Sequence, residues 1–225
     1  MIPEDGKVPI GYKHIDCHMI FDVKMDLTRK ARFVAGGHQT DPPKESTYSS
    51  VVSRDSVRIA FLIAALNNLD ILLADVQNAY LNAPIKEKVY TTAGLEFGAV
   101  NKGQFVLIVQ ALYGIKSSGA RWRDHMAATL RNGSYFSSLA DSDVLMKSQV
   151  KANGNEYWEY ILCYVDDLLV IRHNPKQARA YLGSRYAPKE GSVKEPDASL
   201  GAVIKKWNLN NPDNCMKSRT AWTLH

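Results

Sequence analysis

The fold is decided by residues 160–171, which read YILCYVDDLLVI. Two apolar runs of strand-forming residues flank the acidic pair Asp166-Asp167, so the stretch predicts two neighbouring strands. Asp-Asp is a poor hairpin turn, because Asn-Gly and Asp-Gly are the favoured pairs. Burying both carboxylates would cost several kcal/mol each unless a partner neutralised them. From these residues alone, a metal site and an exposed turn remain equally open.

A third carboxylate ends another apolar run. Ile71–Ala74 predicts a short buried strand, and Asp75 follows it directly. Three carboxylates at adjacent strand ends of one sheet would form an oxygen-rich site suited to Mg²⁺ or Mn²⁺. The alternative for Asp75 is the N-cap of a following helix.

The other elements predict an α+β fold. Helical spacing of apolar residues begins near Ser53 or Asp55, the two N-cap candidates, and ends near Asn67. A second helix is expected from Ser118 to a C′ glycine at Gly133. A third helix is expected to begin at Asn174-Pro175, with proline at its favoured first position. Short strands are expected at 19–23, 32–35, 105–109, 144–146 and 200–204. This order predicts an antiparallel sheet covered on one face by helices.

Composition restricts the function classes. The 225 residues include 28 Lys and Arg against 23 Asp and Glu, so the net charge is +5, and the sequence pI is near 9.0. A hydrophobic content of 45% with 23% charged residues excludes a disordered or collagen-like chain. No apolar run reaches the length of about 20 residues that a membrane span needs, so no membrane partner is expected. The surplus of positive charge is a weak indication of an anionic partner.

Five ordered blocks carry a family resemblance. They are Lys30–Gly37 (KARFVAGG), Tyr48–Val52 (YSSVV), Leu73–Leu81 (LADVQNAYL), Ala111–Lys116 (ALYGIK) and Tyr164–Asp167 (YVDD). In order and approximate spacing they resemble the reverse transcriptase of copia-type LTR retrotransposons, over about residues 7–205. One block alone would carry little weight, whereas five in order are specific.

The resemblance implies the fingers and palm of a right-hand polymerase. It places residues 1–68 and 82–115 mainly in the fingers and residues 69–81 and 116–205 mainly in the palm, with 206–225 as an irregular tail. It also implies that Asp75, Asp166 and Asp167 are catalytic and hold two Mg²⁺ ions, with Mn²⁺ as a substitute. One ion would activate the primer 3′-hydroxyl, and the other would stabilise the phosphates of the incoming nucleotide.

The resemblance also implies a substrate pocket. Arg32, assisted by Lys30, would contact the triphosphate, and Tyr80 would lie under the incoming sugar and exclude a 2′-hydroxyl. The remaining family positions are Val76, Tyr113, Gly114 and Lys116 for the nucleotide and template pocket, Tyr164 and Val165 at the primer end, and Arg121 on the template–primer phosphates. Core packing is the alternative for Tyr80, and a solvated surface position is the alternative for Lys30 and Arg121.

The expected activity is RNA-directed DNA synthesis, in which dNMP is transferred from dNTP to a primer on an RNA or DNA template. A thumb is largely absent from the expected fold, which suggests a truncated fragment. The remainder of a retroelement polyprotein, including integrase and RNase H, is an expected partner. With no targeting signal visible, we expect a location in cytoplasmic retroelement particles or in the nucleus. The alternatives are an inactive remnant that binds nucleic acid and a metal-dependent nuclease.

Overall fold

The protein is described here from a computed structural model. The structure describes residue 3, residues 6–174, 183–186 and 194, and the strand backbones of 198–199, 202–208 and 220–224. The chain forms two compact units, one of residues 1–49 and 78–126 and the other of residues 50–77 and 127–225. Both contain strands and helix, which confirms the α+β class. No helix in the described part of the chain is long and apolar enough to cross a membrane.

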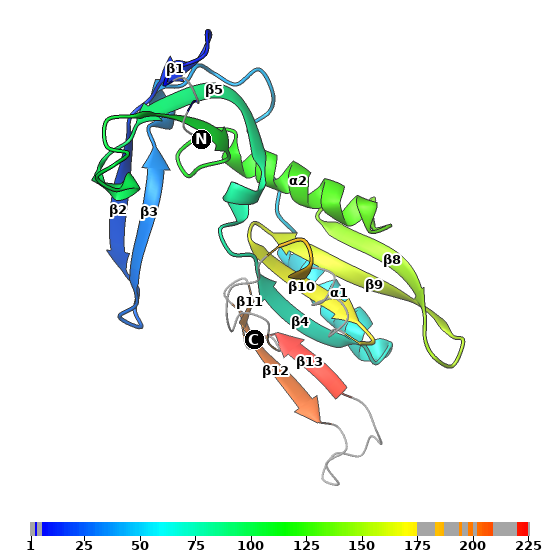
Figure 1. Cartoon of the computed structure of the whole chain (residues 1–225). Helices are drawn as coiled ribbons and strands as arrows, with labels where there is room; N and C mark the ends of the chain where they lie inside the picture. Colours follow the sequence, from blue (N-terminus) through cyan, green and yellow to red (C-terminus); the bar gives the residue numbers. More distant parts are fainter. Residues whose placement is uncertain are drawn as a thin grey trace. The chain divides into compact units, whose positions relative to one another are not determined.

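The second unit is built on an antiparallel five-stranded sheet with the strand order β4-β10-β9-β8-β7 (Figure 1). The elements of this unit are α1 (Arg54–Leu66), β4 (Asp70–Asp75), β7 (Phe136–Ser137), β8 (Val144–Val150), β9 (Glu156–Tyr164), β10 (Asp167–Arg172), β11 (Ala198–Ser199), β12 (Ala202–Asn208), β13 (Thr220–Leu224) and the C-terminal part of α2 (Ser118–Asn132). The expected antiparallel sheet is therefore present. Strand β10 lies between β4 and β9, and its residues Leu168–Ile171 are apolar on both faces.

Helix α1 covers one face of this sheet. Its apolar positions include Val57, Phe61 and Ala64, which are buried against Ile71 of β4 and Leu169 of β10 in one core cluster. Burial of such side chains contributes about 2 kcal/mol each to folding. The helix expected near these residues is thus confirmed, and the helical spacing was the signal that found it.

The N-terminus of α1 is capped twice. The Oγ of Ser53 accepts a hydrogen bond from the backbone N–H of Ser56, which decides between the two N-cap candidates. Oδ2 of Asp141 accepts further hydrogen bonds from the Ser53 backbone N–H at 3.0 Å and from the Ser56 Oγ at 2.6 Å. A carboxylate at a helix N-terminus also interacts favourably with the helix dipole.

Replacing Asp141 by Asn is expected to reduce the free energy of unfolding by about 1 kcal/mol at pH 7. Partial burial pushes the pKa of Asp141 up, but the hydrogen bonds from Ser53, Ser56 and Asp143 outweigh it and hold this pKa below its ordinary value. A depressed pKa contributes stability above about pH 4 that is lost as the pH falls. Urea unfolding of both chains at several pH values should therefore show a difference that shrinks in acid; a constant difference would contradict this role.

The C-terminus of α2 uses a different residue from the one expected. Ser134 takes the left-handed conformation with φ of 67°, and Gly133 does not. The N–H of Tyr135 donates to the carbonyl of Leu130, and the N–H of Ser134 donates to that of Arg131. These are the two hydrogen bonds of a Schellman motif with Ser134 at C′. The expected end of the helix is confirmed. The C′ residue is Ser134 rather than Gly133, because the two hydrogen bonds fix which residue takes this position.

A buried polar network crosses the same sheet. Tyr135 Oη donates to Oε1 of Glu159 at 2.5 Å, and Nε of Arg172 lies 3.2 Å from Oε2 of that carboxylate. The second contact is close enough for attraction between charges but lacks the alignment of a hydrogen bond. Glu159 is only 2% exposed, so the contacts with Tyr135 and Arg172 offset part of the cost of burying its carboxylate.

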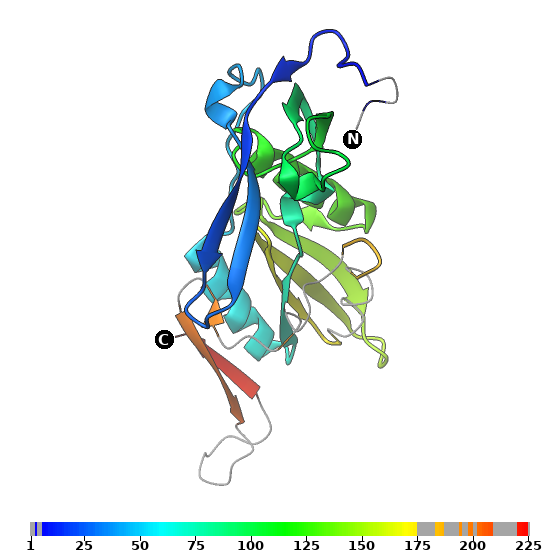
Figure 2. The same cartoon turned by 60° about the vertical axis from the view of Figure 1, so that its left-hand side comes forward.

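The first unit contains two small sheets, β1-β5-β6 and β2-β3. Its elements are β1 (Lys13–His14), β2 (Cys17–Val23), β3 (Arg29–Ala35), η1 (Gly37–Gln39), η2 (Ala79–Asn82), β5 (Pro84–Thr92), η3 (Leu95–Phe97), β6 (Phe105–Gln110) and the N-terminal part of α2. The antiparallel hairpin β2–β3 stands out in Figure 2 and confirms both strands expected there. Strand β5 is missing from the sequence expectation, because three charged residues interrupt its apolar pattern.

Two glycines let backbone segments of this unit cross closely. A Cβ atom built on Gly37 would lie 1.8 Å from the carbonyl oxygen of Gly114. A Cβ atom on Gly114 would lie 2.0 Å from the carbonyl oxygen of Ala35, and Gly114 has φ of +94°. No other residue type fits either position without moving backbone.

The C-terminal residues correct one expectation. Strand β12 overlaps the strand expected at 200–204, but it runs on to Asn208 and pairs antiparallel with β13, which lies in the part expected to be an irregular tail from residue 206. The pairing partner lies more than a dozen residues away, and local periodicity does not reveal such a partner. Most of the third helix expected after Asn174 lies outside the described residues.

Candidate active site

The three predicted catalytic acids lie at one end of the neighbouring strands β4 and β10 of the second unit. Asp75 ends β4, Asp167 begins β10, and the two residues are direct partners in the antiparallel register. Residues directly opposite each other in such a pair point to the same face of the sheet. The carbonyl of Asp166 accepts a hydrogen bond from the Val76 N–H at 2.9 Å, which ties the turn to the end of β4. Strand pairing thus brings together residues that are about ninety positions apart.

Val165 and Asp166 form the two-residue turn between β9 and β10, since Tyr164 and Asp167 pair across it. Asp166 therefore lies in a hairpin turn and Asp167 begins the next strand; Asp167 is exposed and Asp166 is half-buried, as in the exposed-turn alternative. Val165 has φ of 55°, a conformation that is unfavourable for a β-branched residue. Strained turns of this kind concentrate at functional sites, because the surrounding structure must hold them in place.

The side chains of Asp75, Asp166 and Asp167 are all carboxylates. Carboxylate oxygens are the ligands that a hard divalent cation prefers. The three acids are placed near one another by the backbone register of β4, β10 and β9. Among the described residues, no group of three His, Cys, Asp or Glu side chains already converges as a metal site. The fit to Mg²⁺ therefore rests on residue type and strand register.

A cluster of two aromatic rings and one cation lies in the first unit. The rings of Tyr80, in η2, and Tyr113, after β6, are 4.8 Å apart and tilted by 43°. Cζ of Arg32, on β3, lies 5.9 Å from the centre of the Tyr113 ring, within the range of a cation–π interaction. The N–H of Ala35 donates to the carbonyl of Tyr113 at 2.8 Å and holds Tyr113 beside β3. Three residues predicted to contact the nucleotide are thus neighbours.

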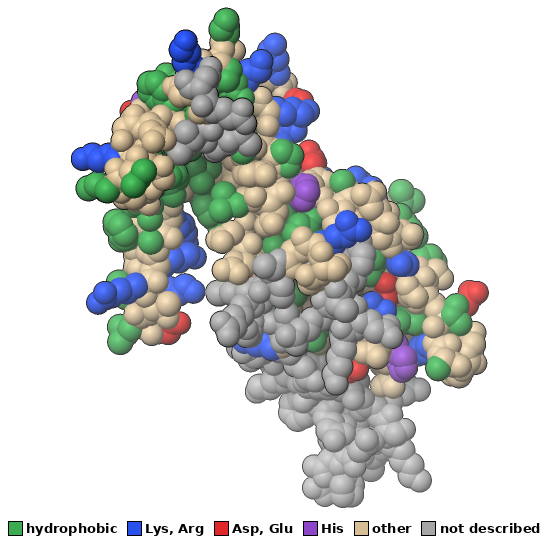
Figure 3. Space-filling view, viewed as in Figure 1, with side chains coloured by type: hydrophobic (Ala, Val, Ile, Leu, Met, Phe, Trp, Pro, Cys, Tyr) green, Lys and Arg blue, Asp and Glu red, His purple; other side chains and the backbone are tan. Residues whose placement is uncertain are grey.

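Other predicted residues have structural contacts of their own. Nζ of Lys116 donates to the Thr40 carbonyl at 3.1 Å, and Arg121 forms an ion pair with Glu45. Lys30 lies opposite Asp22 on the hairpin β2–β3. Figure 3 shows Lys and Arg side chains gathered on that hairpin, and the hairpin and its connecting turn carry Lys24, Arg29, Lys30 and Arg32. Val76 is buried, whereas Tyr164 and Val165 are 40% and 36% exposed.

Comparison with known proteins identifies the family. Residues 2–189 match the family model described as reverse transcriptase (RNA-dependent DNA polymerase). The chain belongs to the reverse transcriptase family. The five sequence blocks that resemble copia-type retrotransposon enzymes all lie inside the matched part, so that resemblance is confirmed.

Its relatives are retrotransposon polyproteins. The chain is 32% identical over 166 residues to the transposon Ty1-BL Gag-Pol polyprotein of Saccharomyces cerevisiae, covering 71% of this chain and 9% of that one. It is 27% identical over 173 residues to the Pol polyprotein from transposon TNT 1-94 of Nicotiana tabacum, covering 73% of this chain and 13% of that one. It is also 27% identical over 187 residues to the Pol polyprotein from transposon RE2 of Arabidopsis thaliana, covering 78% of this chain and 12% of that one. This reverse transcriptase domain thus spans about a tenth of the length of these relatives.

Proposed function

We propose that the chain is the fingers and palm part of an RNA-directed DNA polymerase of a copia-type retrotransposon. It would transfer dNMP from dNTP to a primer 3′-hydroxyl on an RNA or DNA template. The single observation that carries the proposal is the register that sets Asp75 opposite Asp167 beside the Val165–Asp166 turn. In this proposal the first unit holds most of the expected fingers and the second unit most of the expected palm, but residues 50–68, expected in the fingers, belong to the second unit and residues 116–126, expected in the palm, to the first.

In this proposal Asp75 and Asp166 would hold two Mg²⁺ ions, and Asp167 would contribute to their orientation. When bound, the ions would lower the pKa of the attacking hydroxyl and offset the charge that develops on the phosphates. The protein's own contribution is positional. The hydrogen bond from the Val76 N–H to the Asp166 carbonyl and the pairing of β4 with β10 hold the carboxylates at one sheet edge.

The Arg32–Tyr113–Tyr80 cluster of the first unit is proposed to contact the incoming nucleotide. Arg32 supplies a planar, permanently charged guanidinium, which suits a triphosphate. Tyr80 supplies a flat ring for the sugar, and the neighbouring Tyr113 ring limits how far that ring can turn away. A ring fixed at this position would exclude a 2′-hydroxyl and would therefore favour a deoxyribose over a ribose.

The test is primer extension by the purified chain with Mg²⁺ and dNTP on RNA and DNA templates, beside Asp166→Asn. The proposal expects extension on both templates and none with the variant. Template binding without extension would instead identify an inactive remnant, and strand cleavage without dNTP would identify a nuclease. The proposal also expects Tyr80→Ala to accept NTP more readily than the native chain does.

A further inference from the structure

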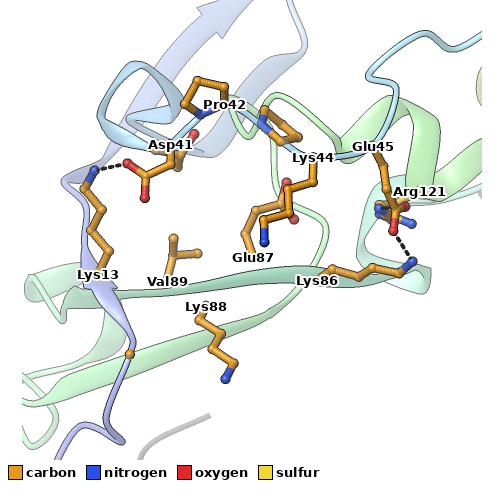
Figure 4. A pocket seen from close by; sticks show the side chains of 13 residues that line it. Lys13, Asp41, Pro42, Lys44, Glu45, Lys86, Glu87, Lys88, Val89 and Arg121 are labelled. Atoms are coloured by element: carbon orange, nitrogen blue, oxygen red, sulfur yellow. Dashed lines mark hydrogen bonds and ion pairs between the residues drawn. The ribbon is translucent and has the colours of Figure 1, made fainter.

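The hairpin β2–β3 is a sheet of two strands, and no third strand lies beside it in the described part of the chain (Figure 2). Its base is anchored, because Cys17 and Ala35, at the inner ends of the two strands, pack into the core of the first unit. Strand β1, which precedes the hairpin, and strand β5 are joined to the segment 40–45 by ion pairs (Figure 4). The distal half of the hairpin has no such support, and a two-stranded sheet by itself is only marginally stable in water.

The distal half of β2 exposes large apolar side chains. Phe21 is 76% exposed, and Val23 is 60% exposed. Successive side chains of a strand alternate between faces, so Met19, Phe21 and Val23 share one face of the hairpin. Directly opposite Phe21 on β3 is Ala31, whose methyl group is too small to cover an aromatic ring. Strand β3 therefore gives Phe21 no cross-strand neighbour of its own size.

The backbone of β2 has an open edge beside these side chains. The Lys24 N–H donates to the Thr28 carbonyl across the hairpin at 3.0 Å. Backbone groups alternate in direction along an antiparallel strand, so the even-numbered residues of β2 point theirs towards β3 and the odd-numbered residues point theirs away. The outward N–H and C=O groups of Met19 and Phe21 have no strand partner among the residues that the structure describes.

The two strands of the hairpin differ in charge. Strand β3 carries Arg29, Lys30 and Arg32 within four residues, and such charges on an edge strand oppose its pairing with another copy of itself. Strand β2 carries one charged side chain, Asp22, together with His18. The sequence of β2 is thus compatible with itself, whereas that of β3 is not.

We propose that β2 pairs antiparallel with β2 of a second copy of this chain, about a two-fold axis at Phe21. This axis joins the outward backbone groups of the two copies, and it sets Phe21 opposite Phe21 and Met19 opposite Val23. The Val23 N–H donates to Oδ1 of Asp22 at 2.8 Å in the single chain, and in the pair it donates to the Met19 carbonyl of the other copy. Asp22 lies opposite Ile20, so no like charges are directly opposed.

The size of this interface sets its strength. The pairing joins two hairpins into a four-stranded sheet, and the two Phe21 rings supply the contact that β3 does not. Five residues of each strand bury less than the roughly 1,200 Å² at which stable interfaces begin. We therefore expect a reversible dimer with a Kd on the order of 10 µM.

Sedimentation equilibrium of the full chain between about 1 and 100 µM tests the proposal, since this range brackets the expected Kd. Phe21→Lys should weaken the dimer at least about tenfold, because two ammonium groups would meet at the axis. Leu62→Lys is the matched control, because Leu62 is 59% exposed on α1 and the dimer should not change. Urea unfolding should show that both variants are as stable as the native chain.

Disulfide trapping tests the register. Directly opposed residues of a hydrogen-bonded pair have Cα atoms about 5.5 Å apart, within the reach of a disulfide. Phe21→Cys should therefore form a disulfide-linked dimer with oxidised glutathione, which takes up the two electrons and two protons of the thiols and becomes two reduced molecules. Val23→Cys is the matched control, because its two copies would be offset by about 13 Å along the strands. The native chain measures the background from its own cysteines.

Four results would overturn the proposal. They are a monomer at every concentration, an undiminished dimer of Phe21→Lys, loss of the dimer in Leu62→Lys, and equal trapping of Phe21→Cys and Val23→Cys. None of these measurements depends on polymerase activity. Failure of primer extension would therefore leave the proposal intact, and a monomeric chain would not affect the catalytic proposal.

Discussion

Replacing Asp75 by Asn is expected to slow Mg²⁺-dependent primer extension at least about a thousandfold, because a catalytic metal contributes several kcal/mol to the transition state. Asn keeps the shape of the side chain but loses the charge that would hold the cation. Asp75 ends β4 opposite Asp167, so no other carboxylate on β4 can replace it at that corner. The measurement is the initial rate of extension of a labelled primer at saturating dNTP.

Asp70→Asn is the matched control, because Asp70 lies at the opposite end of the same strand, where it faces Arg172 in the register. Its extension rate should stay within about threefold of the native rate, since a typical surface substitution changes stability by about 0.5 kcal/mol or less. Urea unfolding should show that Asp75→Asn remains folded. Equal loss of rate in both variants would contradict the assignment of the catalytic corner.

Replacing Gly37 by Ala is expected to reduce the free energy of unfolding by about 3 kcal/mol or more. The new methyl group would lie 1.8 Å from the carbonyl oxygen of Gly114, and backbone cannot yield as a flexible side chain can. Gly114 follows Tyr113, so the shift should also disturb the contact between Tyr113 and Tyr80. Denaturant unfolding measures the loss of stability.

Gly119→Ala is the control for this variant. Gly119 lies in the first turns of α2, and a Cβ atom there would be 3.4 Å from the Ser49 Cβ, an ordinary contact. Alanine in a helix should be neutral or stabilise by up to about 1 kcal/mol. If Gly37→Ala unfolded at the same denaturant concentration as Gly119→Ala, the close crossing of the two segments would be disproved.

Prediction from the sequence was most successful where the signal is local. Helices α1 and α2 were found because a helix repeats its buried face every three to four residues, and this pattern is visible in a single segment. Strand β10 was found because four consecutive residues within it, Leu168–Ile171, are apolar. Strand β5 was missed because charges at Lys86, Glu87 and Lys88 hide the alternation, and only its pairing with β1 and β6 makes it a strand.

The sequence by itself determined the family, the α+β class and the residue types of the proposed catalytic corner, because each of the five blocks and each apolar run is contiguous in the chain. Tertiary structure alone decided which residues meet. The opposition of Asp75 and Asp167 and the packing of Tyr80 against Tyr113 join positions far apart in sequence. Such contacts are set by strand register and by close backbone packing, and neither is visible in local composition or periodicity.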